Sequence, residues 1–366
     1  MGVKRSLLFG VHSLCAGGTE RVVSGFLNEL SASHDFELHC VLYGRRREQF
    51  YALDSEITVH KPSFDFDKYP RAISTLKTIS FLRSVVNDLQ PIAFYNFGER
   101  WNNLALLSTL GLSTPVIVAD RSSPAASLGS SHEFLRKRLY PHARTVIVQT
   151  NEAKETLLKR LPRLKKVVVL PNPVFCRPKH DSEHRRSQEP VVLFVGRLIP
   201  SKNVDRLIRI FQQVAEPGWT LRIVGDDAQG FSLRDDLEKL AERLGITDRV
   251  LFSGFQADMA SVYRNSSVFA FPSSSEGFPN ALAEALSFGL PAVAYDCSAG
   301  PSDLIDEGVN GFLVPNFDDA LFAEKLALLM RESALRERMA SDALRASKAL
   351  AVEKIVPKLL QLAPVD

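Results

Sequence analysis

Two glutamates, Glu276 and Glu284, bracket a Gly-Phe-Pro-Asn loop within the stretch FPSSSEGFPNALAEAL, just where a short apolar helix is expected to begin. Paired carboxylates can act as acid and base across a glycosidic bond, accept hydrogen bonds from sugar hydroxyls, or stabilise a helix N-terminus. A glycosidase needs its two carboxyl groups about 5 to 9.5 Å apart, and this spacing in sequence does not fix that distance. All three interpretations stay open on these residues alone.

Two cations follow a second apolar run. VVLFVG ends at Gly196, Arg197 and Lys202 come next, and a helical pattern begins near Asn203. In a parallel sheet, ligands bind at the carboxyl ends of the strands, where helix N-termini present unpaired N–H groups. Either cation alone is most simply a solvated surface residue. Together, at a strand-to-helix turn, they predict a diphosphate site.

A pair of glycines occupies the corresponding turn near the N-terminus. SLLFGVHS has the pattern of a buried strand, Gly17 and Gly18 follow it, and we expect Thr19 to cap the next helix. Glycines let a ligand approach the backbone closely. The turn lacks the GxGxxG pattern, and no acidic residue for a ribose is evident about 20 residues further on. A dehydrogenase is therefore only weakly indicated.

The elements that must position these residues alternate regularly. Apolar runs and amphipathic helical patterns follow one another, which predicts an α/β protein with parallel, doubly wound sheets. The rhythm stops in the charged stretch CRPKHDSEHRRSQE. We therefore expect two Rossmann-like domains facing across a cleft. The expected ranges are an N-terminal domain at 1–175, a linker at 176–189, a C-terminal domain at 190–345, and a helix at 346–366 that can pack back on the N-terminal domain.

Composition narrows the class of protein. A length of 366 residues favours about two domains, and a net charge of +3 gives no argument for nucleic-acid binding. No run approaches the roughly 20 apolar residues of a membrane span, and the N-terminus is a poor signal peptide, so we expect a cytoplasmic protein. The four cysteines form no CxxC pair, which gives no support to a zinc knuckle or a disulfide framework and fits a reducing compartment: Cys15, Cys40, Cys176 and Cys297.

Several other polar positions have both a functional and a plain interpretation. Glu99 and Arg100 follow the run PIAFYNFG and could contact an acceptor, although a charged helix start explains them at least as well. His12, close to the glycines, is equally a packing residue or a ligand contact. The DxD pattern at 65–67 is a metal-binding motif of a different fold, but it lies in a polar loop, and we expect no metal site.

One basic amphipathic stretch points to a surface. DKYPRAISTLKTISFLRSVVNDL mixes Lys68, Arg71, Lys77 and Arg83 with apolar residues, and GRRREQF at 44–50 adds positive charge. Such helices can lie on an anionic membrane, although most are one covered face of a domain. We expect peripheral contact with the inner membrane on its cytoplasmic side.

The motifs taken together resemble a known family. AGGTERVV, PNPV, VGRLIPSKN and EGFPNALAEAL are similar to the motifs of retaining glycosyltransferase family 4, which has the GT-B fold. The resemblance extends from AGGTERVV to about residue 330 and is closest to bacterial enzymes that build surface glycans on lipid carriers.

The resemblance implies a role for each motif residue. Arg197 and Lys202 would hold the donor diphosphate, Glu284 the ribose hydroxyls and Glu276 the transferred sugar. Many members carry a histidine where VADRSSP here places Asp120 and Arg121, so these two join Glu99 and Arg100 as acceptor-side candidates without an assigned role. The other implied donor contacts are backbone groups of Gly277, Phe278, Pro279 and Asn280 at the sugar, Phe255 near the base, and Gly17 and Gly18 near the phosphate.

The implied function is transfer of a hexose or N-acetylhexosamine, with retention and without a metal. The donor would be a nucleotide sugar, UDP-linked, and the acceptor a glycan, which polyprenyl diphosphate can carry. Two fixed cations and helix N-termini can stabilise the charge that grows on the departing diphosphate. Two alternatives remain: a UDP-sugar hydrolase or epimerase on the same fold, and a non-catalytic subunit that binds nucleotide sugars.

Overall fold

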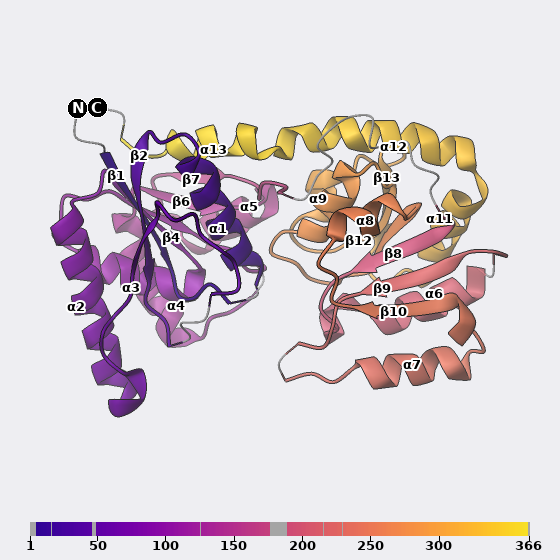
Figure 1. Ribbon diagram of the computed structural model, residues 1–366, viewed down its shortest axis with the longest axis horizontal. Helices are drawn as coiled ribbons and strands as arrows, with labels where there is room; N and C mark the ends of the chain where they lie inside the picture. The colour runs from indigo at the N-terminus through magenta and orange to yellow at the C-terminus, as the bar shows by residue number, and fades with distance from the viewer. Residues whose placement is uncertain are drawn as a thin grey trace. The chain divides into compact units, whose positions relative to one another are not determined.

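The computed structural model (Figure 1) divides into two compact units, each built around its own parallel sheet. Unit 1 comprises residues 1–173 and 352–366, and unit 2 comprises residues 174–351. The linker expected at 176–189 falls outside the described residues except for Glu189. The structure describes residues 5–15, 17–45, 49–124, 126–175, 189–214, 216–228 and 230–364.

The sheet of unit 1 has the strand order β3-β2-β1-β4-β5-β6-β7. Every neighbouring pair is parallel, and β1 (Arg5–Val11) lies between β2 (Phe36–Leu42) and β4 (Ala93–Phe97). The chain builds outward from β1 on one side and then on the other, so the strand order reverses between β1 and β4. The remaining strands are β3 (Thr58–His60), β5 (Val116–Ala119), β6 (Thr145–Val148) and β7 (Val167–Val169).

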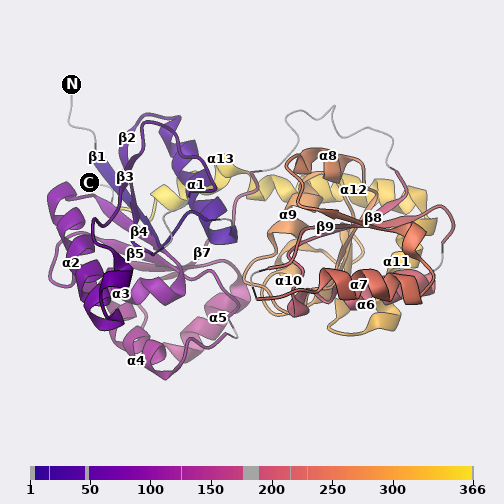
Figure 2. The same cartoon turned by 60° about the horizontal axis from the view of Figure 1, so that its bottom comes forward.

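Helices cover both faces of this sheet (Figure 2). On one face, the rings of Phe9 and Tyr95 stack 5.1 Å apart beneath α1 and α13, and the Tyr95 hydroxyl donates to the carbonyl of Leu359 at 2.9 Å. The last helix therefore belongs to unit 1. The helices are α1 (Gly18–Ser31), α2 (Arg71–Leu89), α3 (Glu99–Thr109), α4 (Ser130–Leu139), α5 (Asn151–Arg160) and α13 (Val352–Leu360).

Unit 2 repeats the arrangement with the strand order β10-β9-β8-β11-β12-β13. Its order reverses between β8 (Val191–Val195) and β11 (Val268–Phe271). One core cluster lies under α6, α7 and α11, and another lies under α8 and α9 on the opposite face. The other elements are β9 (Thr220–Val224), β10 (Val250–Gly254), β12 (Ala292–Asp296), β13 (Gly311–Pro315), α6 (Val204–Val214), α7 (Arg234–Arg243), α8 (Met259–Arg264), α9 (Asn280–Ser287), α10 (Pro301–Leu304), α11 (Asp319–Arg331) and α12 (Ser333–Ser347).

The sequence correctly predicted doubly wound α/β units but misplaced one helix start. Thr19 is not the cap of α1, because the helix already begins at Gly18 and Gly17 is its N-cap. The Glu20 carboxylate folds back over Gly17, where a Cβ would lie only 2.2 Å from Oε2. A side chain at position 17 would therefore displace the Glu20 carboxylate from this place.

A pair of histidines bridges β2 and β3. Nδ1 of His39 lies 3.1 Å from Nε2 of His60, and the His39 side chain is buried. Burial lowers the pKa of both rings below the ordinary 6.5, and at His39 the nearby Glu37 offsets this only in part. A histidine with a lowered folded-state pKa costs stability once the pH falls below its unfolded pKa.

We therefore expect this pair to leave the free energy of unfolding unchanged above pH 6.5. The free energy of unfolding should then decrease as the pH falls from 6.5 toward the lowered folded-state pKa values. His39→Gln should flatten this decline, whereas the same change at the exposed His142 should not. Urea unfolding over a pH series measures it. A decline that is the same in wild type and His39→Gln would show that this pair is not its source.

Candidate functional site

The first candidate site lies at the strand-order reversal of unit 2. The loop after β8 runs from Gly196 to Asn203, and the loop after β11 runs from Pro272 to Pro279. The helices after these neighbouring strands pack on opposite faces of the sheet, and sheets of this kind bind their ligands in the crevice at such a reversal. Arg197, Lys202 and Glu276 all lie on these loops, so the structure brings the predicted catalytic residues to one edge.

Lys202 and Glu276 form an ion pair across this crevice. Their side chains are only 16% and 11% exposed, and the Lys202 ammonium also lies 5.4 Å from the centre of the Phe271 ring. A partly buried pair is much less screened by salt than one on the open surface. The residues predicted to hold the diphosphate and the sugar are therefore preorganised against each other.

Backbone contacts fix the two loops in place. Asn203 adopts a left-handed conformation with φ 48°, and its side-chain amide donates to the carbonyl of Pro272 at 2.8 Å. The backbone N–H of Ser274 donates to the carbonyl of Ser201 at 2.9 Å. These bonds join the two loops on either side of Lys202, and so they hold its position.

Arg197 combines a fixed backbone with a free side chain. Gly225, with φ 126°, lies so close that a Cβ there would be 2.0 Å from the carbonyl oxygen of Gly196. The N–H of Leu198, next in the chain, donates to the carbonyl of Asp226 at 2.9 Å. The Arg197 guanidinium is exposed and has no ion-pair partner among the described residues. It is therefore available to a ligand.

Helix α9 begins at Asn280 as expected and carries Glu284 in a buried position. The Glu284 side chain accepts a hydrogen bond of 3.0 Å from the Tyr263 hydroxyl, and Tyr263 in turn stacks on Phe288 at 5.2 Å. Only 6% of Glu284 is exposed. Its carboxylate is therefore oriented by Tyr263 rather than solvated.

The rest of the predicted loop is held by close packing. Phe278 and Pro279 are buried, while Gly277 is partly exposed. Gly300, with φ 128°, would place a Cβ 2.3 Å from Cδ of Pro279. Glycine is thus required behind the proline, and the stiff loop that the sequence predicted is present.

Phe255, the predicted base contact, follows β10 and is 67% exposed. Its backbone N–H donates to the carboxylate of Asp226 at 2.8 Å. A large exposed ring on a fixed backbone is a suitable platform for a planar base.

The equivalent edge of unit 1 gathers the other candidates. Gly17 and Gly18 lead into α1, and the ring of His12 stacks on Trp101 at 5.2 Å with its Nδ1 3.9 Å from Glu20. Arg100 is exposed. This edge is also a strand-order reversal, between β1 and β4.

Asp120 and Glu99 are tied into the framework of this edge. Asp120 forms a buried ion pair with Arg136 and accepts a 2.6 Å bond from the Tyr140 hydroxyl and a 3.1 Å bond from Asn102. Burial by itself would lower the pKa of Arg136, but the charges of Asp120, Tyr140 and Glu133 together raise that pKa above its ordinary value. Glu99 accepts bonds from the Arg121 N–H, at 3.0 Å, and from the Ser122 hydroxyl. Both acids therefore hold loops in place.

The DxD stretch caps a helical turn. The Asp65 carboxylate accepts from the Asp67 N–H at 3.0 Å, and Asp67 pairs with Arg45 on the surface. Within the described part of the chain, no group of three or more His, Cys, Asp or Glu side chains is arranged to hold a metal ion.

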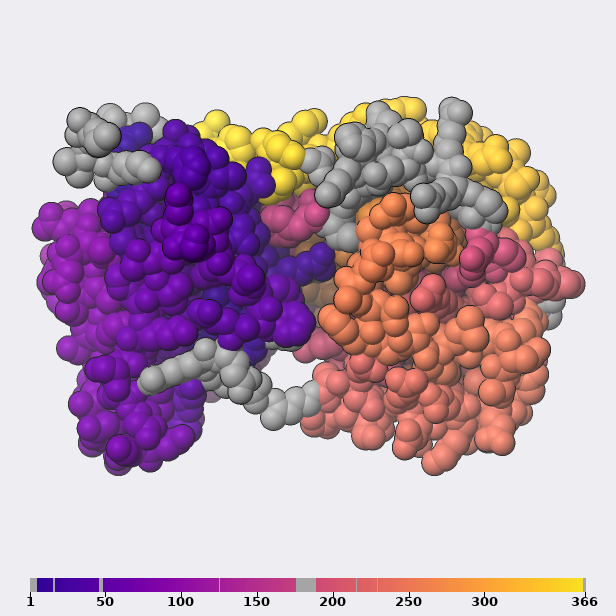
Figure 3. All heavy atoms as spheres, in the orientation of Figure 1, coloured from indigo at the N-terminus to yellow at the C-terminus, as the bar shows by residue number. Residues whose placement is uncertain are grey.

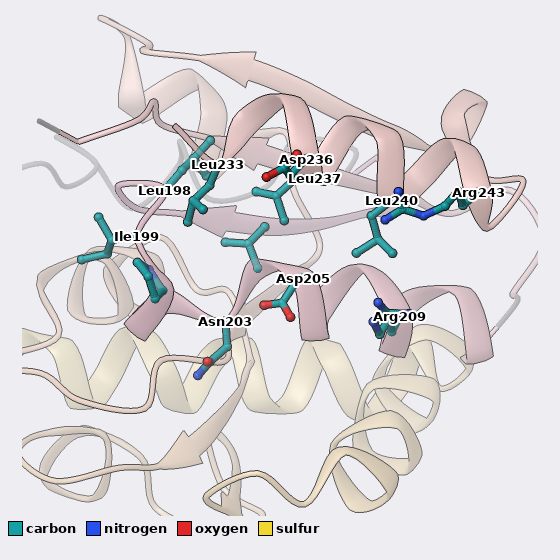
Figure 4. A pocket seen from close by; sticks show the side chains of 12 residues that line it. Leu198, Ile199, Asn203, Asp205, Arg209, Leu233, Asp236, Leu237, Leu240 and Arg243 are labelled. Carbon is teal, nitrogen blue, oxygen red and sulfur yellow. The ribbon is translucent and has the colours of Figure 1, made fainter. Parts of the chain in front are cut away.

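A separate pocket of about 420 Å³ lies between α6 and α7 in unit 2 (Figure 4). Leu198, Leu237 and Leu240 form its apolar wall, and Asp205 and Arg209 lie along α6. Its wall includes Leu198, Ile199 and Pro200, from the same loop that carries Arg197 and Lys202. The predicted donor residues themselves do not line it.

Comparison with known families agrees with this geometry. Residues 16–176 match the family described as Glycosyltransferase Family 4, and residues 177–345 match Glycosyl transferases group 1. The chain belongs to this glycosyltransferase family. Its fold is GT-B, with two Rossmann-like units of parallel sheet.

Curated relatives of this glycosyltransferase include bacterial enzymes. One, from Campylobacter jejuni, is named GalNAc-alpha-(1->4)-GalNAc-alpha-(1->3)-diNAcBac-PP-undecaprenol alpha-1,4-N-acetyl-D-galactosaminyltransferase; it is 27% identical over 97% of both chains. Another, the amylovoran biosynthesis glycosyltransferase AmsD of Erwinia amylovora, is 29% identical over 94% of this chain and 95% of its own.

Solved structures share the fold. The apo form of the lipopolysaccharide outer core galactosyltransferase WaaB superposes with a TM-score of 0.79, at 20% identity over 98% of both chains. HepE from Anabaena, in complex with UDP and glucose, has a TM-score of 0.78 at 19% identity, also over 98% of both chains.

Several residues of these two edges were not anticipated. Asn203 and Tyr263 position Lys202 and Glu284, and Glu20 and Trp101 lie beside the glycine turn. Asn203 had a signal, because asparagine tolerates the left-handed conformation better than most residues. The partners of Tyr263 and Asp120 are distant in sequence and gave none.

Replacing the buried acid of unit 1 should be costly. Asp120→Asn leaves the buried Arg136 guanidinium with only Glu133, 3.8 Å away, as a charge partner, and we expect a loss of roughly 3 kcal/mol in the free energy of unfolding. Asp67→Asn, which breaks an exposed pair, should cost at most about 1 kcal/mol. Fluorescence of Trp101 in a Trp219→Phe background reports unit 1 during urea unfolding. Equal losses in both variants would contradict the role of Asp120.

Proposed function

We propose that this glycosyltransferase moves a hexose or N-acetylhexosamine from a UDP-sugar to a glycan acceptor, with retention of anomeric configuration and without a metal. The observation that carries the proposal is the crevice of unit 2, where Lys202 pairs with Glu276 and Arg197 is free to bind a ligand. Two cations beside the N-terminus of a helix suit a diphosphate.

Each part of the donor would contact a different set of residues in unit 2. The diphosphate would contact Arg197 and Lys202, and the sugar would contact Glu276 and the backbone at 277–280. The ribose would reach Glu284, whose carboxylate Tyr263 orients, and the base would lie near the exposed ring of Phe255. The fold that this chain shares with HepE, which was solved with UDP and glucose, supports the choice of UDP.

The reaction would break the bond between the anomeric carbon and the diphosphate oxygen. The electron pair leaves with the diphosphate, and Lys202 and Arg197 stabilise the negative charge that develops there. The acceptor hydroxyl attacks from the same face and gives its proton to the departing phosphate oxygen. Configuration is thereby retained, and the chain needs no separate base at the position of Asp120.

The acceptor would be a glycan on polyprenyl diphosphate, in assembly of a bacterial surface polysaccharide. The Campylobacter jejuni relative is named for an undecaprenol-linked acceptor, and AmsD for biosynthesis of the polysaccharide amylovoran. Sequence similarity over nearly the whole of these chains supports an acceptor of the same class.

A lipid-linked acceptor requires a protein that works at the membrane surface, and α2 offers a surface for this. Among the described residues, no helix is both long and apolar enough to cross a bilayer. The first turns of α2 form a lobe that stands out from unit 1 at the lower left of Figure 3. There Tyr69, Ile73 and Leu76 are 37%, 44% and 66% exposed beside the exposed Lys68 and Arg71.

The structure shows which side of α2 is buried and which side is exposed. The side of α2 that packs on the unit carries Ser74, Thr78 and Leu82, whereas Ile73 and Leu76 point outward. Arg83 is not free for lipid, since it donates to the carbonyls of Ser108 and Leu110. Of the basic stretch 44–50, residues 46–48 lie outside the described residues. We infer that the outward end of α2 rests on an anionic leaflet.

Removing a predicted donor contact should weaken nucleotide binding. In wild type, UDP should raise the melting temperature, because a ligand that binds only the folded state stabilises it. Lys202→Met should lose a charge-assisted bond, which weakens UDP binding roughly 10- to 100-fold, and should slow transfer by a similar factor or more. Glu284→Ala should weaken UDP binding through the lost ribose contact.

Arg209→Met, an exposed change on α6 in the same unit, is the matched control and should bind UDP as wild type does. Product analysis completes the experiment. A UDP response unchanged in Lys202→Met would place the donor site elsewhere, and free or isomerised sugar formed without acceptor would indicate a hydrolase or an epimerase instead.

Membrane contact through α2 is tested with vesicles. The protein should float with anionic liposomes, less so at high salt because charge attraction is screened, and Leu76→Ser with Ile73→Ser should reduce flotation. Leu328→Ser, at an exposed leucine of α11 in unit 2, is the control. Flotation that is absent, or that is the same in all variants, would disprove the membrane surface.

A further inference from the structure

The strand-order reversal of unit 1 gathers a cluster of polar side chains that the donor site does not use. His12 and Glu20 follow β1, Trp101 follows β4, and Arg121 follows β5. The carboxyl ends of these parallel strands lie along one edge, where His12 contacts Glu20 and Trp101, and where the charge of Glu20 acts on Arg121. Each comes from a separate loop or helix start, as is usual for a ligand site in this fold.

Arg121 is the most unusual member of the cluster. Its Nε and Nη2 atoms are buried and have no hydrogen-bond partner, although the side chain as a whole remains partly exposed. No described carboxylate lies within ion-pairing distance, and the guanidinium lies 5.6 Å from the centre of the Phe97 ring. Burial lowers its pKa to about 10, and the charges of Glu99 and Glu20 offset this only in part.

A buried guanidinium without acceptors is costly, because its donors have lost water and gained nothing in exchange. Such a group calls for an explanation, and a ligand that supplies the missing acceptors is one. A planar fork of donors suits two neighbouring oxygens.

Among the described residues, the Glu20 carboxylate lacks hydrogen-bond donors, as the Arg121 guanidinium lacks acceptors. Its side chain is 12% exposed, its nearest described charge partner is His12 at 3.9 Å, and it accepts no hydrogen bond from the described residues. Glu99 differs, since it already accepts from the Arg121 N–H and the Ser122 hydroxyl. The cluster therefore offers unsatisfied donors on Arg121 and an unsatisfied acceptor on Glu20.

The balance of charge decides what kind of ligand fits. Arg121 contributes +1, and Glu20 and Glu99 contribute −1 each, so the acids outnumber the arginine at this cluster. A carboxylate or phosphate on the acceptor would therefore be matched less well than a neutral group. A neutral polyol suits the cluster, since its hydroxyls both donate and accept. Trp101, partly exposed and stacked on His12, adds a flat apolar surface for the C–H face of a ring.

We propose that Arg121 and Glu20 together clamp the hydroxyl groups of an uncharged sugar ring of the acceptor, with Arg121 donating and Glu20 accepting. This inference rests on the proposed function. It implies that the acceptor sugar whose hydroxyl attacks the donor is uncharged. Asp120 and Arg100 are not part of the clamp, because Asp120 is committed to Arg136 and Arg100 is exposed.

The test uses the full chain with saturating UDP and a set of free probes. Saturation-transfer NMR with methyl glycosides of glucose, galactose, N-acetylglucosamine and N-acetylgalactosamine should detect binding of at least one. Arg121→Met and Glu20→Gln should weaken this binding roughly 10- to 100-fold, because each removes hydrogen bonds to a charged group. Arg121→Lys should retain only part of it, and Arg163→Met, an exposed arginine of unit 1, should retain all of it.

Stability separates a ligand site from a structural role. Arg121→Met should not lower the melting temperature, because the guanidinium has no hydrogen bonds to lose, whereas Asp120→Asn should lower it clearly. A loss in Arg121→Met as large as in Asp120→Asn would overturn the proposal. So would the absence of glycoside binding, or binding that persists in Arg121→Met and Glu20→Gln.

The probes also distinguish the ligand class and the two proposals. Arg121-dependent binding of methyl glucuronide or inorganic phosphate in preference to the neutral glycosides would make this an anion site and overturn the inference. If UDP raises the melting temperature of Arg121→Met as much as that of wild type, the donor proposal is supported independently of the result with the glycosides. If UDP has no effect on wild type, the donor proposal fails while glycoside binding at Arg121 can still be measured.

Discussion

The reversal of strand order in each parallel sheet decides where this chain can meet a ligand. At β8 and β11 in unit 2, and at β1 and β4 in unit 1, neighbouring strands send their following helices to opposite faces, so their loops part. At each reversal, loop side chains and the N–H groups of helix N-termini are available to a ligand. The Lys202–Glu276 pair occupies one, and the Arg121–Glu20 cluster occupies the other.

The two edges differ in how their charges are compensated. In unit 2, Lys202 and Glu276 neutralise each other, and Arg197 adds one uncompensated positive charge, which suits a diphosphate. In unit 1, Asp120 and Arg136 cancel, and the remaining acids outnumber Arg121. Under the proposed function, the free Arg197 would serve an anionic donor at the edge of unit 2, and the edge of unit 1 would receive a neutral sugar of the acceptor.

Local patterns predicted most of this, and long-range contacts account for the rest. The apolar runs located the strands, the break in rhythm located the division into units, and the motif residues Arg197, Lys202 and Glu276 do meet at one edge. The start of α1 was missed because the sequence pointed to the threonine as a side-chain cap, whereas the helix begins one residue earlier after Gly17, without a side-chain cap bond. The buried side of α2 could not be read from its apolar residues because it includes Ser74 and Thr78, whose hydroxyls bond to nearby backbone carbonyls. Tyr140 and Arg136 gave no signal, since their partner Asp120 lies 20 and 16 residues away in another element.

Unit 1 is completed by a helix, α13, that follows unit 2 in the chain. Ile355 and Leu359 are fully buried in unit 1, and Tyr95 and Arg144 both bond to carbonyls near the end of the chain. During synthesis, domains commonly form in the order in which they emerge from the ribosome. Here the first unit to emerge lacks part of its core until the last residues appear, so the second unit can be complete before it. A ribosome that stalls within α13 would hold a nascent polypeptide whose unit 2 can be complete while unit 1 still lacks this helix.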